Sequence, residues 1–245
     1  MKFFFMLIVL TIPYLLYGQK SFVFKPGLDI SLITLGGSGL VFSQLYLGKK
    51  HQPISQDEFN LLSKDKLFFL DQPRKEFKIP ATLSDIISIG NIAPAFYFLI
   101  NKENRKSYGI YLTMYLETML LNTSITDIIK YSSKRPRPYV YNFISYDEVL
   151  KSQSINETNL SFYSGHTSSI AATSFFMART ITLNETNTTK KTLVWIGAAT
   201  IPAIQGGLRV AAGKHFTSDV ISGYLMGAIT GYLIPTLHIK KQAKH

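Results

Sequence analysis

The sequence contains no cysteine, which excludes disulfide bridges and cysteine-ligated zinc sites. Acidic residues are scarce too: 15 Asp and Glu stand against 26 Lys and Arg, a formal net charge of +11. That balance favours anionic partners such as phosphates or anionic lipids. It does not favour nucleic acid, because the basic residues are scattered between apolar segments and form no single stripe with interleaved aromatics. Internal repeats are also lacking, and the 245 residues predict one domain with a sizeable core. No obligate protein partner is evident from the sequence.

The first eighteen residues, MKFFFMLIVLTIPYLLYG, direct the chain to a membrane or across one. A single Lys is followed by an apolar run and then a small residue, which is typical of a secretory signal peptide cleaved after Gly18. An uncleaved first membrane helix is the alternative, because Leu16 is a poor residue three positions before the cut. Both interpretations give the chain an export signal.

Six uncharged or weakly charged apolar segments have nearly the length that a membrane-spanning helix needs. They are residues 30–48, which is Gly-rich, and residues 81–100, 108–129, 164–183, 192–212 and 218–237. We therefore expect an all-α fold, a membrane-embedded bundle of about six core helices preceded by the signal peptide. A soluble helical bundle stays an alternative, because Gly, Ser, Thr and Pro interrupt each segment and the mean hydropathy of +0.12 is low.

The expected organisation has four parts. They are a signal peptide at 1–18, an N-terminal segment and polar connector at 19–80, a helical core at 81–237 and a basic tail at 238–245.

Short basic loops predict the orientation in the membrane. Residues 101–106, residues 188–191 and the tail KKQAKH are basic, as cytoplasmic loops tend to be. The segments around 130–164 and 209–219 then face the periplasm of a bacterial inner membrane. If the signal is cleaved, this orientation requires that residues 30–48 do not span the membrane. If the signal is retained, the orientation requires a single membrane crossing before residue 81.

Residues 162–169, FYSGHTSS, begin one of the apolar segments with a possible anion site. Ser164 is a good helix cap, and Gly165 allows backbone N–H groups to converge on a ligand at the helix N-terminus. His166 follows at once. Alone, this stretch is also compatible with an ordinary Ser-capped helix whose histidine lies near the surface.

A second histidine stands in RVAAGKHFTSD, residues 209–219. If a helix begins near Phe216, Asp219 lies one turn from His215, close enough to accept the Nδ1 proton. That contact would fix the tautomer and leave Nε2 free as a nucleophile. An unrelated histidine beside a helix-start Asp is the alternative.

The basic stretch KYSSKRPRP, residues 130–138, closes the segment 108–129. A membrane-flanking cluster of cations is the simplest interpretation. However, Pro136 and Pro138 restrict the backbone on both sides of Arg137. A solvated anchoring charge needs no such restraint, whereas a guanidinium that meets phosphate oxygens in a fixed fork does.

Taken in order, Lys-x6-Arg-Pro, Ser-Gly-His and Arg-x5-His-x3-Asp resemble the motifs of the type-2 phosphatidic acid phosphatase superfamily. That superfamily also includes bacterial class A acid phosphatases and vanadium haloperoxidases. The resemblance covers residues 80–237, and the motifs border helices in the same layout. Two positions depart from the pattern: Tyr163 replaces the Pro before Ser-Gly-His, and Leu208 replaces the Ser before the third-motif Arg. Neither position carries a reactive atom that the chemistry requires.

The resemblance implies a role for each motif residue. The catalytic residues would be His166, His215 and Asp219, and the phosphate-binding residues would be Lys130, Arg137, Ser164, Gly165 and Arg209. His215 would attack phosphorus, oriented by Asp219, and His166 would protonate the leaving oxygen and later activate water. The cations would stabilise the transferring group, so no metal and no cofactor is expected at the site.

The function expected is that of a metal-independent phosphatase acting on a phosphomonoester or diphosphate of a membrane lipid, through a phosphohistidine. Three alternatives stay open: a soluble periplasmic acid phosphatase, a vanadate-dependent haloperoxidase, and a membrane protein that binds phosphate without turnover. The haloperoxidase is disfavoured by the short chain. Two acids inside apolar segments, Glu117 and Asp127, are either orienting groups for the basic cluster or polar residues with unrelated partners.

Overall fold

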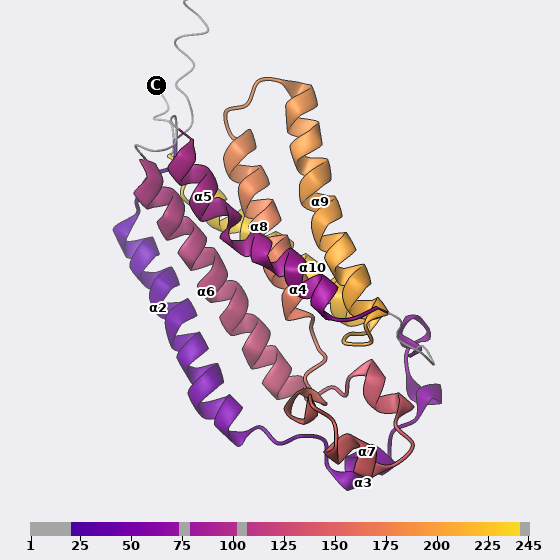
Figure 1. The fold of residues 1–245 in the computed structure, drawn as a ribbon. Coiled ribbons are helices and arrows are strands. Elements are labelled where there is room, and N and C mark those ends of the chain that lie inside the picture. The colour runs from indigo at the N-terminus through magenta and orange to yellow at the C-terminus, as the bar shows by residue number, and fades with distance from the viewer. Residues whose placement is uncertain (1–20, 74–78, 102–106, 241–245) are drawn as a thin grey trace, which may run out of the picture.

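The computed structural model describes residues 21–73, 79–101 and 107–240, and these residues form a helical bundle (Figure 1). The expected signal peptide lies outside the described residues. The long helices are α2 (Pro26–Phe42), α4 (Thr82–Ser88), α5 (Ala93–Ile100), α6 (Tyr108–Ser133), α8 (Gly165–Thr182), α9 (Thr188–Ala211) and α10 (Thr217–Leu237). A π-helical stretch, Ser43–Gly48, continues α2, and a 3-10 turn, Ile89–Ile92, joins α4 to α5.

Short helices lie in the two segments that connect α2 to α4 and α6 to α8. They are α3 (Gln56–Asn60), α7 (Tyr146–Leu150) and 3-10 turns at Lys64–Lys66, Phe69–Asp71, Pro138–Asn142 and Ile155–Glu157. In the described part of the chain the only β pairing is an isolated antiparallel bridge between Phe22 and Ile239. The all-α fold expected from the sequence is confirmed.

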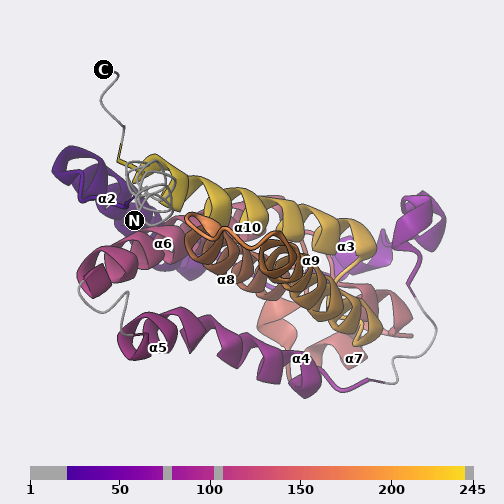
Figure 2. The ribbon, with the colours of Figure 1, turned by 90° about the horizontal axis from the view of Figure 1, so that it is seen from above.

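Among the described residues, six helical crossings run along the length of the bundle: α4 and α5 together form one, and α2, α6, α8, α9 and α10 form the others. Helix α8 lies at the centre, in contact with α10, α9, α6 and α4, while α2 packs along α6 (Figures 1 and 2). All three expected motifs therefore come to one end of the bundle: α6 ends there, α8 begins there, and the α9–α10 loop turns there.

Polar side chains lie inside this bundle and apolar side chains lie on its surface. Helix α6 buries Glu117, Asn122 and Thr126, among other polar residues. Helix α9 exposes Leu193 and Ile196, and the outer faces of α2 and α10 are similarly apolar. Four segments, Pro26–Gly48, Thr82–Ile100, Thr188–Ala211 and Thr217–Leu237, are long and apolar enough to cross a membrane. A surface this apolar is suited to lipid, and the chain is a membrane protein.

The contact between α8 and α10 depends on three glycines spaced four residues apart. A Cβ on Gly223, Gly227 or Gly231 would lie 2.5, 2.0 or 2.2 Å from the carbonyl oxygens of Ser164, Ser168 and Ala172, respectively. No side chain fits at such distances, so only glycine allows the two backbones to approach this closely. The first of these contacts fixes α10 against the residue that begins α8.

Two of the expected boundaries fall beside tertiary contacts. Residues 26–48, expected in the N-terminal segment, pack along α6. His238, expected as the first residue of the basic tail, is completely buried at the end of α10. These contacts are with helices remote in sequence, which the sequence alone does not show.

Candidate active site

Helix α8 begins at the sequence Ser164–Gly165–His166, as expected. The Ser164 hydroxyl caps the helix: it accepts from the Thr167 N–H at 3.5 Å and lies 2.9 Å from the Thr167 hydroxyl. At Gly165, a Cβ would lie 3.1 Å from Lys130 Nζ. Glycine therefore lets the Lys130 ammonium approach the positive end of α8 closely. Two positive groups placed together in this way favour an anion between them.

The buried Arg137 guanidinium is held by main-chain carbonyl groups. Its Nε donates to the Glu157 carbonyl oxygen at 2.8 Å, and Nη1 donates to the Lys214 carbonyl oxygen at 3.2 Å. Nη2 lies 3.2 Å from the Glu157 carboxylate. Burial lowers the pKa of Arg137, and the Glu157 carboxylate opposes that shift. The bond to Lys214 connects the first motif to the loop that carries His215.

Arg209, near the end of α9, is also buried. Its Nη1 donates to the Ser84 hydroxyl at 3.0 Å and to Asp85 Oδ1 at 3.2 Å. Its Nε has no hydrogen-bond partner. A buried guanidinium with an unused donor is suited to receive a ligand oxygen.

A tight turn brings His215 back toward α8. Helix α9 ends at Ala211, and Gly213 takes a left-handed conformation with φ of 68°, which favours glycine. The ring of His215 is buried, and its Nδ1 donates to the Ser161 carbonyl oxygen at 2.7 Å. Its Nε2 has no hydrogen-bond partner. Burial, together with the charges of three site cations, lowers the pKa of His215 well below its usual value. The imidazole is therefore neutral near pH 7, with a free lone pair on Nε2.

Asp219 differs from expectation in how it reaches His215. Its Oδ2 lies 3.8 Å from His215 Nδ1, beyond hydrogen-bond distance. The same oxygen accepts from the Ser161 hydroxyl at 2.6 Å and from the Phe216 N–H at 2.8 Å. Its other oxygen accepts from Arg135 Nη1 at 2.5 Å. The carboxylate therefore fixes the groups around the imidazole, and the Ser161 carbonyl takes the Nδ1 proton.

His166 lies at the edge of the site and is more exposed than His215. Its Nε2 is 3.2 Å from Asp85 Oδ1, the same oxygen that receives Arg209. A polar cavity of about 310 Å³ beside it is lined by Lys130, Gly165 and His166, among others. His215 lines a second cavity of about 180 Å³, together with Asp71 and Phe216.

Sequence reasoning missed three charged residues that support the site. Arg135 Nη2 lies 2.8 Å from Asp71 Oδ2, so one guanidinium joins the connector to Asp219. Asp85 bridges His166 and Arg209. Arg135 stood in the basic stretch at 130–138 and was the one of the three with a local signal. The two acids lie in segments with no motif, and only the tertiary fold brings them here.

The arrangement suits a phosphoryl group more than a metal. Three cations and a helix N-terminus converge with one unpartnered imidazole nitrogen. Among the described residues, the one group of three His or acidic side chains close enough to hold a metal ion is Asp29, Glu117 and His238. Those residues lie at the opposite end of the bundle, where α2 begins and α10 ends. Of the two acids left open by the sequence, Glu117 is thus remote from the site, and Asp127 accepts from Gln44 Nε2 at 2.7 Å.

Comparison with known proteins identifies the family to which this chain belongs. A family model described as PAP2 superfamily matches residues 111–243, more than half of the chain, and includes all three motifs. Phospholipid phosphatase 1 of Rattus norvegicus is 30% identical over a stretch that makes up 45% of this chain and 46% of that protein. The chain thus spans just under half the length of that curated relative.

Among solved structures, a transmembrane PAP2 type phosphatidylglycerolphosphate phosphatase from Bacillus subtilis is similar, with a TM-score of 0.48 and 19% identity. The superposition covers 83% of this chain and 96% of that one.

Proposed function

Because this chain belongs to the PAP2 superfamily, we propose that it is a phosphatase that hydrolyses a lipid phosphate through a phosphohistidine, with no metal in the reaction. The observation that carries the proposal is the buried, unpartnered Nε2 of His215, whose Nδ1 proton is already held by the Ser161 carbonyl. A neutral imidazole fixed in this tautomer is a ready nucleophile. Three cations close enough to lower its pKa supply the electrostatic stabilisation.

In the first step, His215 Nε2 attacks phosphorus while the bond from phosphorus to the ester oxygen breaks. The leaving oxygen takes a proton from His166, which must therefore begin protonated. Burial and the Arg209 charge lower the pKa of His166, and Asp85, 3.2 Å from Nε2, opposes that shift. The negative charge of a bound phosphate would add to the effect of Asp85 and favour the charged form. Lys130, Arg137 and Arg209 balance the charge on the three non-bridging oxygens.

In the second step, neutral His166 removes a proton from water, and the water oxygen attacks phosphorus. The bond from phosphorus to Nε2 breaks, and its electron pair returns to the imidazole. Inorganic phosphate leaves, and both histidines are restored to their initial protonation states. Asp219 touches no reacting atom in this scheme: it is a positioning residue that acts through Ser161, Phe216 and Arg135.

A membrane lipid is the substrate class that the surroundings of the site favour. The helices that frame the site carry an apolar outer surface, so the acyl chains of a substrate have a lipid path to the bundle. The rat relative is named for phospholipids, which agrees with this class.

We also propose that the site faces the periplasm of a bacterial inner membrane. Lys190, Lys191 and Lys240 lie at the end of the bundle opposite the site, as the positive-inside rule requires for a cytoplasmic end. Because the number of crossings, six, is even, residue 21 lies at the same end as Lys240, the proposed cytoplasmic end. If the signal were cleaved after Gly18 in the periplasm, residue 21 would lie at the periplasmic end of the bundle. Cleavage and the proposed orientation therefore exclude each other if α2 spans the membrane. Reporter fusions after residues 104, 150 and 240 test the orientation, which is overturned if the fusion at 150 reports the cytoplasm.

A phosphate-release panel tests the function. The detergent-extracted protein is assayed on phosphatidate, undecaprenyl diphosphate, lipid A and a soluble ester, with His215→Ala as the matched blank. Release from a lipid, absent in the blank, is the expected result. Turnover of the soluble ester alone, by protein extracted without detergent, would indicate a soluble acid phosphatase. No release from any of the four would indicate a protein that binds phosphate without turnover.

A further inference from the structure

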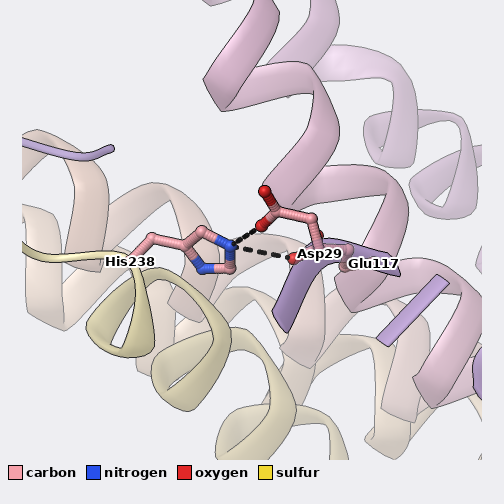
Figure 3. Close-up of side chains that lie close together, drawn as sticks. All are labelled: Asp29, Glu117 and His238. Carbon is pink, nitrogen blue, oxygen red and sulfur yellow. Dashed lines mark hydrogen bonds and ion pairs between the residues drawn. The ribbon is translucent and has the colours of Figure 1, made fainter. Parts of the chain in front are cut away.

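Three buried titratable side chains meet at the end of the bundle opposite the phosphate site. Asp29 comes from the first turn of α2, Glu117 from α6, and His238 from the residue that caps α10 (Figure 3). One ligand atom from each lies within 4.8 Å of the other two. Asp29 is 7% exposed, and the other two are completely buried.

The imidazole of His238 is oriented so that one nitrogen faces the two acids. Its Nδ1 lies 2.8 Å from the Ile234 carbonyl oxygen, which only accepts, so Nδ1 carries the proton and donates it there. Its Nε2 lies 2.7 Å from Asp29 Oδ1 and 3.4 Å from Glu117 Oε2. A backbone carbonyl that fixes the remote ring nitrogen in this way is the usual support of a metal-ligating histidine.

The two acids are not equally satisfied. Asp29 Oδ2 accepts from the Lys25 N–H at 2.8 Å, which fixes that carboxylate at the start of α2. Glu117 is buried, and neither of its oxygens has a hydrogen-bond partner. A buried carboxylate without partners is costly, because it loses its hydration and gains nothing in exchange. Glu117 is thus an unpartnered polar group directed into the cluster.

The charges of the cluster identify what would satisfy it. A single proton on Nε2 leaves two carboxylates against one imidazolium, a net negative charge inside the bundle. One divalent cation, with neutral His238 and both acids ionised, balances the three groups completely. Such an ion also gives Glu117 a closer partner than the His238 imidazole, which lies 3.4 Å away.

We propose that Asp29, Glu117 and His238 form a binding site for one divalent transition-metal ion, separate from the phosphate site. Its ligands are His238 Nε2, Asp29 Oδ1 and the carboxylate of Glu117. A nitrogen with carboxylate oxygens is a donor set that suits Zn²⁺ or Mn²⁺. With one oxygen from Glu117 these are three ligand atoms, and a water molecule would complete a tetrahedral set.

Binding requires one small adjustment. Ligands about 2.1 Å from a tetrahedral ion are separated from one another by roughly 3.4 Å. The Glu117–His238 separation of 3.4 Å already has that value, whereas the Asp29–His238 separation of 2.7 Å must widen.

The ion would join helices that the sequence separates widely. Residues 29, 117 and 238 belong to three different crossings, and α2 otherwise meets the bundle mainly through α6. Its function is therefore to hold the first and last crossings together. The site takes no part in the phosphatase chemistry proposed above.

Metal analysis of the purified full-length chain tests the proposal, with a tag that contains no histidine. After loading with Zn²⁺ and desalting, we expect about one equivalent of Zn²⁺ per chain by mass spectrometry. Glu117→Gln keeps the size of the side chain but removes its charge, and we expect its Zn²⁺ content to fall at least tenfold. His51→Ala, which alters a histidine bound to the Asn156 carbonyl outside the cluster, is the matched control and should retain the metal.

Thermal unfolding in detergent gives a second readout, which does not depend on measuring the metal content. Adding Zn²⁺ to chelator-treated wild-type protein should raise the thermal midpoint by about 5 °C or more. The midpoint of Glu117→Gln should not respond to Zn²⁺. The proposal is overturned if the wild-type protein neither retains the ion nor gains stability from it, which would mean that the three groups share protons instead. Equal Zn²⁺ content in Glu117→Gln and the wild type would overturn it as well.

Discussion

His215 Nδ1 lies 2.7 Å from the carbonyl oxygen of Ser161 and 3.8 Å from the carboxylate of Asp219. The imidazole proton is therefore held by the backbone, and the acid holds the backbone in place. Asp219 accepts from the hydroxyl of Ser161, the same residue whose carbonyl meets the ring. The tautomer of His215 thus depends on Asp219 only indirectly.

This geometry predicts a limited cost for Asp219→Asn. The amide offers one accepting oxygen to the three donors around the carboxylate, so the loop shifts while the Ser161 carbonyl still fixes the tautomer. We expect kcat/KM to fall roughly 10- to 100-fold. Ser161→Ala keeps the carbonyl and should cost less. A loss near the roughly 10⁴-fold typical of a wrong tautomer would mean that Asp219 meets Nδ1 directly, as its sequence spacing suggested.

Gly165→Ala tests the close approach of Lys130 to the start of α8. The new methyl group would lie 3.1 Å from Lys130 Nζ and 3.2 Å from Thr126 Cγ2, so the flexible ammonium moves and Thr126 shifts by a few tenths of an ångström. We expect KM to rise and inhibition by vanadate to weaken, each roughly 3- to 30-fold. Gly207→Ala is the control, because no atom lies within 4 Å of its added Cβ. Equal inhibition constants in the two variants would contradict a role for Lys130 in holding the phosphoryl group.

Gly227→Ala tests the packing of α8 on α10. Its Cβ would lie 2.0 Å from the Ser168 carbonyl oxygen, a backbone atom that cannot turn aside, so the helices must separate. We expect a loss of about 1–3 kcal/mol, measured as a lower thermal midpoint in detergent. Gly197→Ala, in open space on α9, should be neutral or stabilising. If the midpoint of Gly227→Ala matches that of Gly197→Ala, the close contact does not exist in the membrane.

Phosphate release should survive EDTA and be blocked by vanadate. The site offers cations and an imidazole, and the cluster able to hold a metal lies at the far end of the bundle. Glu117→Gln, which is expected to lose the ion bound there, should remain active at 25 °C. The mechanism is wrong if EDTA abolishes activity while the protein stays folded, and added metal restores it.

The sequence was sufficient to locate the helices of the core. The apolar segments 108–129, 164–183 and 218–237 correspond closely to α6, α8 and α10, because capping residues and apolar length are local signals. The segment 81–100 also forms one crossing, although a 3-10 turn at Ile89–Ile92 interrupts it.

The sequence could not show which charged groups meet. Asp71 and Asp219, which are 148 positions apart in the sequence, share Arg135, and nothing local to Asp71 marks it. His238 looked like part of a polar tail, yet it is buried between acids 209 and 121 positions earlier in the chain. Such contacts depend on how the helices are arranged, which no periodicity encodes.

Replacing His215 and replacing His166 should impair different steps of the reaction. His215→Ala removes the nucleophile, so both turnover and the phosphoenzyme should disappear. His166→Ala removes the proton donor, which costs roughly 10²- to 10⁴-fold when the leaving oxygen needs protonation. With p-nitrophenolate as the leaving group, protonation matters less, so the first step should partly recover. Hydrolysis still lacks its base, and the phosphohistidine should therefore accumulate.

Labelled substrate and a quench without acid allow the intermediate to be trapped, because a phosphohistidine is lost in acid. The label is expected on His215 in the His166→Ala protein, at a higher level than in the wild type. His215 is the stronger candidate for the nucleophile, because it is buried and its Nε2 has no hydrogen-bond partner. Nε2 of His166, in contrast, already lies 3.2 Å from Asp85. If the label is found on His166 in the His215→Ala protein, the two roles are reversed.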